Sequence, residues 1–121
     1  MSRTFGERLA DAVAARGPLC VGIDPHAPLL EKWGLPDSPH GLARFTDAVV
    51  EALAGSVAVL KPQAAFYERH GSRGLAVLED GVSRARAAGA RGRRRRRAGR
   101  SPGRPAPRPA RRAPGPGPRG R

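Results

Sequence analysis

The sequence predicts an α/β fold in which short parallel strands alternate with helices. Two apolar runs, LCVGI at 19–23 and VAVL at 57–60, are bounded by glycine, proline and charged residues. Runs of this length without polar alternation are typical of strands buried on both faces of a parallel sheet. The strands lie about 30 residues apart and apolar positions recur at helical spacing between them, as in one right-handed βαβ unit.

The segment before the first strand is predicted to be a helix. Thr4 and Glu7 have the spacing of a capping box, apolar residues follow at helical intervals, and Gly17-Pro18 ends the helix. The first strand is closed by Asp24-Pro25. A short helix is expected over 28–33, with a proline in its first turn.

Two longer helices complete the predicted units. The first spans about 41–54 and links the two strands through one apolar face. Pro62 is expected to stop the second strand, because proline has no N–H to donate. The last helix spans about 72–88, and Gly89 is expected to end it.

Two charged side chains are the candidate functional groups. Asp24 follows the first strand and Lys61 follows the second. Parallel α/β folds place ligand and catalytic groups at the carboxyl ends of their strands. By pattern alone, an ordinary Asp-Pro turn and a surface lysine at a strand end explain the two residues equally well.

The remaining reactive side chains favour structural roles. Cys20 lies inside a strand and is expected to be a small buried apolar residue. His26, His40 and His70 lack ligand-like spacing to one another or to Cys20, so no metal site is predicted. One cysteine, no signal-peptide pattern and no long apolar segment lead us to expect a soluble cytoplasmic protein that does not enter a membrane.

Charge divides the chain into two chemically unrelated segments. The formal net charge is +13, yet all ten acidic residues lie before residue 91, where ten Lys and Arg residues balance them. Residues 91–121 consist of Arg, Gly, Pro and Ala with a single Ser. We therefore expect a folded segment over 1–90 and a disordered basic tail over 91–121, because the tail has no large apolar residue with which to form a core.

The folded segment resembles a known enzyme family. LCVGIDP at 19–25 and VAVLKPQAAFYERHGSRGLAVLED at 57–80 resemble the first two strand regions of orotidine 5′-phosphate decarboxylase, in the subfamily typical of high-GC bacteria such as actinomycetes. FGERLADAV near the start and WGLP at 33–36 agree with that subfamily. The resemblance covers about residues 4–90.

The resemblance implies the first two units of a (β/α)₈ TIM barrel in a lyase that needs no cofactor and no metal. Such a lyase converts orotidine 5′-phosphate to UMP and carbon dioxide in pyrimidine biosynthesis. Asp24 corresponds to the acid that binds a ribose hydroxyl, and Lys61 to one member of a catalytic Lys-Asp-Lys-Asp network. Full-length members of the family usually form homodimers.

The chain departs from the family after residue 90. The expected D-A-K-R-G-D motif, with two further aspartates and the proton-donating lysine, is absent. The tail composition is what a GC-rich gene read out of frame would encode, so our leading interpretation is a frameshift near Ala90. We therefore expect no decarboxylation by the chain as written.

Two other interpretations of the tail stay open. In the first, the protein is a non-enzymatic basic protein whose arginines bind nucleic acid non-specifically through its phosphates, since the tail has no aromatic residue to stack on bases. In the second, the SPGRPAPRP segment is a polyproline ligand of an adaptor domain.

Overall fold

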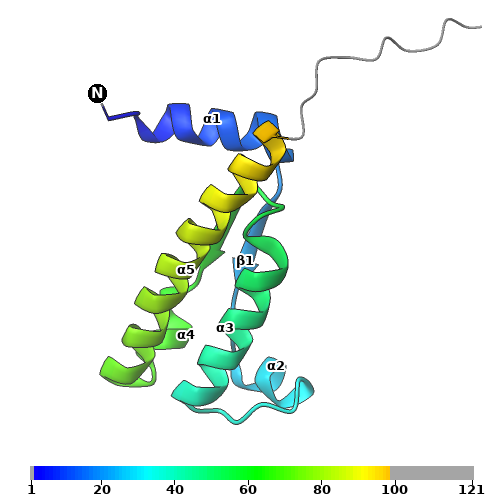
Figure 1. Cartoon of the computed structure of the whole chain (residues 1–121). Coiled ribbons are helices and arrows are strands. Elements are labelled where there is room, and N and C mark those ends of the chain that lie inside the picture. The colour runs from blue at the N-terminus through cyan, green and yellow to red at the C-terminus, as the bar shows by residue number, and fades with distance from the viewer. Residues whose placement is uncertain (1, 99–121) are drawn as a thin grey trace, which may run out of the picture.

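The computed structural model describes residues 2–98, with side chains up to Gly89. Figure 1 shows helices and strands alternating along the chain. The elements are α1 (Phe5–Arg16), β1 (Cys20–Ile23), α2 (Ala27–Lys32), α3 (Pro39–Leu53), β2 (Val59–Pro62), α4 (Ala64–Glu68) and α5 (Gly71–Ala98). The predicted α/β class is confirmed for this part of the chain, as is the capping box between Thr4 and Glu7.

The two strands form a parallel sheet. Their register pairs Cys20 with Val59 and Gly22 with Lys61. The N–H of Val59 donates to the carbonyl of Leu19 at 3.4 Å, and that of Gln63 donates to the carbonyl of Ile23 at 3.0 Å. The register thus extends to Pro62 and the hydrogen bonds to Gln63, because the nitrogen of Pro62 faces away from β1 and no N–H is needed there.

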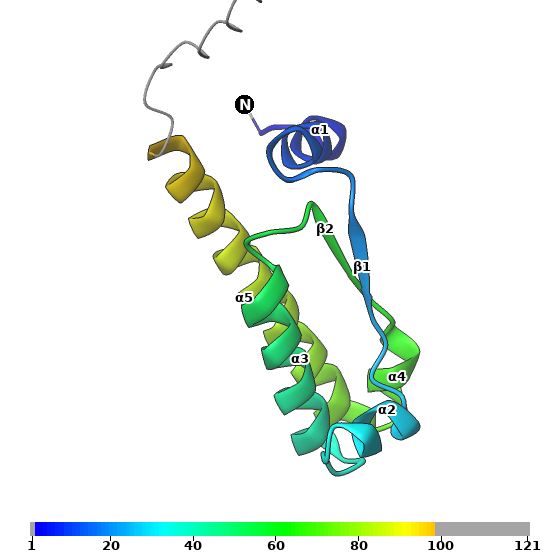
Figure 2. The ribbon, with the colours of Figure 1, turned by 90° about the vertical axis from the view of Figure 1, so that its right-hand side faces the viewer.

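Helices α3 and α5 lie side by side on one face of this sheet (Figures 1 and 2). The core lies between the helices and the sheet and is formed by Ile23, Leu30, Leu42, Phe45 and Tyr67, all of them buried. Where the two long helices meet, a Cβ on Gly81 of α5 would lie 2.7 Å from Thr46 Cγ2 of α3. Glycine at this position therefore lets the two helices pack closely.

The opposite face of the sheet is open, which corrects the prediction of strands buried on both faces. Cys20, Gly22 and Lys61 are exposed on it, whereas Ile23 is buried on the helix side. Cys20 is thus an exposed thiol rather than the small buried residue we expected. The physical reason is that helices cover only one side of the two described strands.

The last helix does not end at Gly89 as predicted. α5 continues to Ala98, so residues 91–98 of the predicted disordered tail are helical. An internal glycine costs only about 1 kcal/mol relative to alanine, and the arginines that follow are good helix formers. The helix therefore crosses the predicted boundary at residue 90, and residues 99–121 of the tail lie outside the described residues.

α1 lies across the end of the molecule at which the strands begin (Figure 1). Its last residue, Arg16, holds this end together. The Arg16 guanidinium donates hydrogen bonds to the carbonyls of Ala54 and Val57, each at 3.3 Å, and to the carbonyl of Gly89. One side chain thus connects α1, the end of α3, the start of the second strand region and α5.

Candidate functional site

The two predicted site residues lie on the same face of the sheet, at its carboxyl end. Asp24 comes directly after β1, and Lys61 is the penultimate residue of β2, opposite Gly22. Because side chains alternate along a strand and paired residues share a face, Gly22, Asp24 and Lys61 belong to one face. This is the open face, so the structure brings both predicted groups to a surface that a ligand can reach.

The carboxylate of Asp24 folds back over the sheet. A Cβ placed on Gly22 would lie 3.5 Å from Asp24 Oδ1. This oxygen is buried and has no hydrogen-bond partner among the described residues. A buried acceptor without a donor costs about 1–3 kcal/mol, so the carboxylate would gain from a donor that reaches it.

Lys61 is exposed on the same face of the sheet as this carboxylate. Within residues 2–98, no ion pair of 4.0 Å or less joins it to Asp24. The absence of a side chain on Gly22 leaves open sheet surface between the two groups. An ammonium group and a carboxylate on opposite sides of this surface suit a ligand that carries both hydroxyl groups and negative charge.

Tyr67 lies in the core below the site. Its hydroxyl is 2.8 Å from Thr46 Oγ1 in a buried hydrogen bond between α4 and α3. Burial raises the pKa of Tyr67 above its ordinary value, the hydrogen bond to Thr46 acts in the opposite direction, and the negative charge of Asp24 adds to the increase. The tyrosine therefore stays neutral at physiological pH and supports the core against which the strand ends pack.

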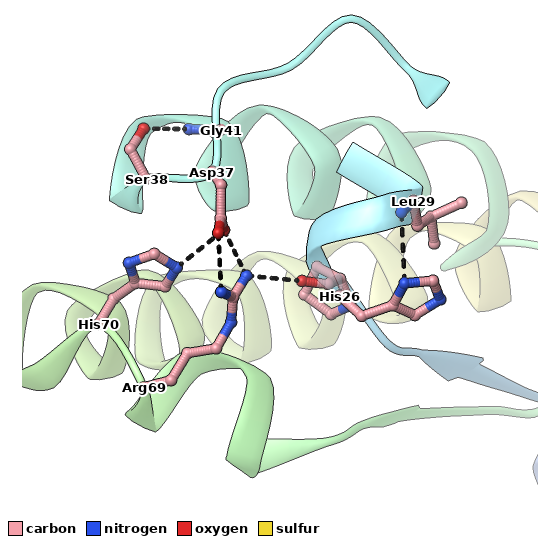
Figure 3. Close-up of polar contacts among 8 residues, drawn as sticks. His26, Leu29, Asp37, Ser38, Gly41, Arg69 and His70 are labelled. Atoms are coloured by element: carbon pink, nitrogen blue, oxygen red, sulfur yellow. Dashed lines mark hydrogen bonds and ion pairs between the residues drawn. The ribbon is translucent and has the colours of Figure 1, made fainter. Parts of the chain in front are cut away.

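The loops at this end of the sheet are tied together by Asp37, Arg69 and His70, which we call the loop clamp (Figure 3). Arg69 donates to both carboxylate oxygens of Asp37, to Oδ2 at 3.0 Å, and to the carbonyl of Pro25 at 3.5 Å. His70 Nε2 lies 3.3 Å from Asp37 Oδ1. The clamp thus joins the segments that follow β1 and β2.

The electrostatics of the clamp favour a charged Asp37. The hydrogen bond from Arg69 lowers the pKa of this carboxyl below its ordinary value, and the electrostatic interactions with Arg69 and His70 act in the same direction. Partial desolvation offsets a fraction of the effect. A bidentate pair between a guanidinium and a carboxylate fixes geometry as well as charge, so the clamp restricts how the two loops move.

Sequence reasoning did not find the clamp. Asp37 lies in none of the predicted elements, and His70 was considered only as a possible metal ligand. In the structure the side chain of His70 is only 15% exposed. His26 caps α2, accepting a hydrogen bond from the N–H of Leu29 at 3.2 Å on Nδ1. In residues 2–98, no three His, Cys, Asp or Glu side chains are grouped closely enough to bind a metal ion.

Comparisons with known proteins point to one enzyme family. The chain is 64% identical over 87 residues to an orotidine 5′-phosphate decarboxylase of Salinispora arenicola, covering 72% of this chain and 31% of the relative. It is 67% identical over 86 residues to that of Streptomyces coelicolor, covering 71% and 31%. The matched region is homologous to orotidine 5′-phosphate decarboxylase. No protein-family model matches the chain.

A solved structure supports the same relationship. A crystal structure from Streptomyces avermitilis, provisionally named an orotidine 5′-phosphate decarboxylase, superposes with a TM-score of 0.71 at 64% identity. The match covers 74% of this chain and 32% of that decarboxylase chain. The chain thus spans about a third of the length of the relatives it matches. The predicted resemblance is confirmed for the matched region.

The described residues hold no helix that is both long enough and apolar enough to cross a bilayer. The longest helix, α5, contains the arginine run of residues 93–97.

Proposed function

We propose that residues 2–89 form part of the substrate site of an orotidine 5′-phosphate decarboxylase and that the chain as written does not catalyse decarboxylation on its own. The observation that carries this proposal is the placement of Asp24 and Lys61 on one face, at the carboxyl ends of two paired parallel strands. The high identity to named decarboxylases supports the choice of substrate.

The chemistry gives each residue a role. Loss of carbon dioxide from the pyrimidine ring leaves negative charge on a ring carbon, and a fixed ammonium group stabilises such charge best where water is excluded. Lys61 would supply this positive charge. Asp24 would accept a hydrogen bond from a ribose hydroxyl and, as a nearby anion, would keep the ammonium group charged.

The exposure of Lys61 is the reason to expect no turnover from this chain alone. Its side chain lies on an open face, where water weakens electrostatic stabilisation. The sequence after residue 80 also contains no acidic residue and no lysine that could complete the charge network or protonate the ring carbon. Incubation of the purified chain with orotidine 5′-phosphate, followed by pyrimidine absorbance, should show only the background rate.

A chimera tests the roles of the two residues. Residues 2–89 would replace the matching segment of the Streptomyces coelicolor relative, and the resulting full-length enzyme should decarboxylate orotidine 5′-phosphate. Lys61→Ala should lower kcat by at least about 100-fold, the scale for removal of a group that stabilises charge in a transition state. Asp24→Asn should chiefly raise KM for the substrate.

Lys32 supplies a matched control. It is the only other lysine of the chain and lies exposed at the end of α2. Lys32→Ala should leave kcat within about twofold, because surface changes of this kind move energies by less than about 0.5 kcal/mol. A folded chimera that keeps its activity after loss of Lys61 would refute the proposed role.

A second proposal concerns residues 91–121. The concentration of 13 arginines in this tail favours non-specific binding to nucleic-acid phosphates if the tail is a genuine protein segment. Truncation after Ala90 should then abolish retention on DNA, and affinity should fall steeply with salt. Resequencing the DNA around codon 90 tests the frameshift interpretation; an intact frame without D-x-K-R-G-D in either shifted frame would contradict it.

A further inference from the structure

Gln63 lies at the carboxyl end of β2, beside the two candidate site residues. It directly follows the last residue of the strand, and its backbone is still extended, with φ −86° and ψ 105°. Its N–H donates to the carbonyl of Ile23 at 3.0 Å, which continues the hydrogen-bonding pattern of the parallel pair. In this pattern an N–H of β2 bonds to the residue that precedes its partner on β1. The partner of Gln63 is therefore Asp24.

The side chain of Gln63 belongs to the same open face as Asp24 and Lys61. Side chains alternate along an extended strand, so Gln63 and Lys61, two residues apart, lie on one side of the sheet. Asp24 lies on this side, because a Cβ on Gly22 would be 3.5 Å from its Oδ1. Neighbouring strands run about 4.8 Å apart. Gln63 thus lies directly across from Asp24, one same-face pair further along than Lys61.

The amide of Gln63 has no structural task in the described part of the chain. Gln63 is the N-cap residue of α4, but its side chain makes no capping hydrogen bond. The side chain is exposed and has no hydrogen-bond partner among the described residues. Glutamine is also absent from the preferred N-cap residues, which have short side chains. An amide that is held beside the carboxylate of Asp24 and is not used for folding is available to a ligand.

The two neighbouring groups have complementary hydrogen-bonding capacity. A carboxylate only accepts hydrogen bonds, whereas a side-chain amide both donates and accepts them. A hydroxyl group is a donor and an acceptor at once, so it can donate to Asp24 and accept from the Gln63 amide. Asp24 Oδ1 is buried without a donor among the described residues, which favours a ligand that brings one. Because the charge of Asp24 repels anions, the pair suits the neutral, hydroxyl-bearing part of a ligand.

We propose that Gln63 is a further substrate-binding residue, whose amide donates a hydrogen bond to the same sugar hydroxyl that donates to Asp24. This inference rests on the proposed function, because it takes the ribose of orotidine 5′-phosphate as the hydroxyl-bearing group. It places the ribose over the pair formed by Asp24 and Gln63. Lys61, one same-face pair back along the strand, is then left for the charged part of the substrate.

The full 121-residue chain allows a direct test, since Gln63 is its only glutamine and the chain has no asparagine. In nitrogen-labelled protein, the paired NMR signals of a side-chain NH₂ group therefore come from Gln63 alone. Millimolar UMP, the reaction product, should shift these signals. A UMP analogue that lacks both ribose hydroxyls should leave them in place at the same concentration. Signals that UMP does not move, or that both nucleotides move equally, would overturn the proposal.

Kinetics of the chimera measure what the amide contributes to substrate binding. Gln63→Leu removes the amide at nearly constant size and should raise KM for orotidine 5′-phosphate about tenfold (about 1.4 kcal/mol), with kcat changed by less than about threefold. Gln63→Glu removes the donor and places a second carboxylate opposite Asp24, so it should raise KM further. Glu51→Leu, at an exposed position in the last turn of α3, is the matched control and should leave KM unchanged.

The outcomes separate this inference from the proposed function. Circular dichroism of the variants should match that of the parent chimera, because Gln63 and Glu51 are exposed. An unchanged KM in Gln63→Leu, in a chimera that loses activity with Lys61→Ala, would overturn the role of Gln63 alone. Full activity after Lys61→Ala would instead refute the proposed function, whereas a shift of the amide signals that requires the ribose hydroxyls would still support the contact with Gln63.

Discussion

The buried hydrogen bond between Thr46 and Tyr67 gives a quantitative test of how the core supports the site. The two side chains are 3% and 0% exposed, and their oxygens are 2.8 Å apart. Thr46→Val keeps the shape of the side chain but leaves the tyrosine hydroxyl buried without its partner. The expected loss in the free energy of unfolding is about 1–3 kcal/mol, the desolvation cost of a buried unpaired group.

Removal of the tyrosine hydroxyl instead should cost less stability. Tyr67→Phe leaves the threonine hydroxyl, which can bond to a carbonyl of the preceding turn of α3, so we expect a loss of about 0.5–1.5 kcal/mol. The double variant has no buried polar group left to satisfy at this contact. Its loss should fall short of the sum of the single losses by about 1 kcal/mol.

Chemical denaturation of the unsubstituted protein, the two single variants and the double variant measures the coupling energy between Thr46 and Tyr67. Ser83→Ala, at an exposed position of α5, is a control that should change stability by less than about 0.5 kcal/mol. Losses that add within about 0.3 kcal/mol would show that the contact carries no energy, and the reasoning would fail.

The effect of burial on the pKa of Tyr67 can be measured directly. Tyr67 is the only tyrosine of the chain, so the absorbance of tyrosinate reports this residue alone. Because burial raises its pKa, the folded protein should ionise above the ordinary value of 10.0. The associated stability is fully present below pH 10 and is lost as pH rises through the folded pKa. Tyr67→Phe should remove this alkaline loss.

Three further predictions follow from single positions. A Cβ on Gly74 would lie 1.9 Å from the carbonyl oxygen of Tyr67, so Gly74→Ala should lower the midpoint of thermal unfolding, whereas Gly6→Ala, with open space around it, should raise it slightly. Arg69 lowers the pKa of Asp37, so the stability that the loop clamp contributes should be present above pH 3.8 and lost as the pH falls below it. Asp37→Asn should therefore make the loss of stability with falling pH less steep, as measured by circular dichroism. Cys20 is exposed, so Ellman's reagent should modify one thiol per native chain; protection until denaturation would contradict the open face.

Local patterns were sufficient to predict the positions of Asp24 and Lys61. Each follows or ends a short apolar run, and the register of a parallel sheet then brings the carboxyl ends of two such runs to one edge. The capping box at Thr4 was equally readable, because it depends on two residues three positions apart. Their functional roles stay predictions.

Properties that depend on neighbours distant in sequence could not be predicted in this way. The exposure of Cys20 follows from the uncovered face of the sheet rather than from the apolar run in which it lies. The clamp joins Asp37 to Arg69 across 32 residues, and no local pattern marks such a pair. The extension of α5 beyond Gly89 was missed because one glycine was given more weight than the helix-forming arginines after it.

Arg16 also has a consequence for how the protein tolerates change. It joins the elements at the end where the strands begin, while Asp24 and Lys61 lie where the strands finish. Arg16 and the two candidate site residues therefore lie at opposite ends of the sheet. Substitutions in the loops that follow β1 and β2, natural or designed, should therefore leave the Arg16 hydrogen bonds at the other end of the sheet intact.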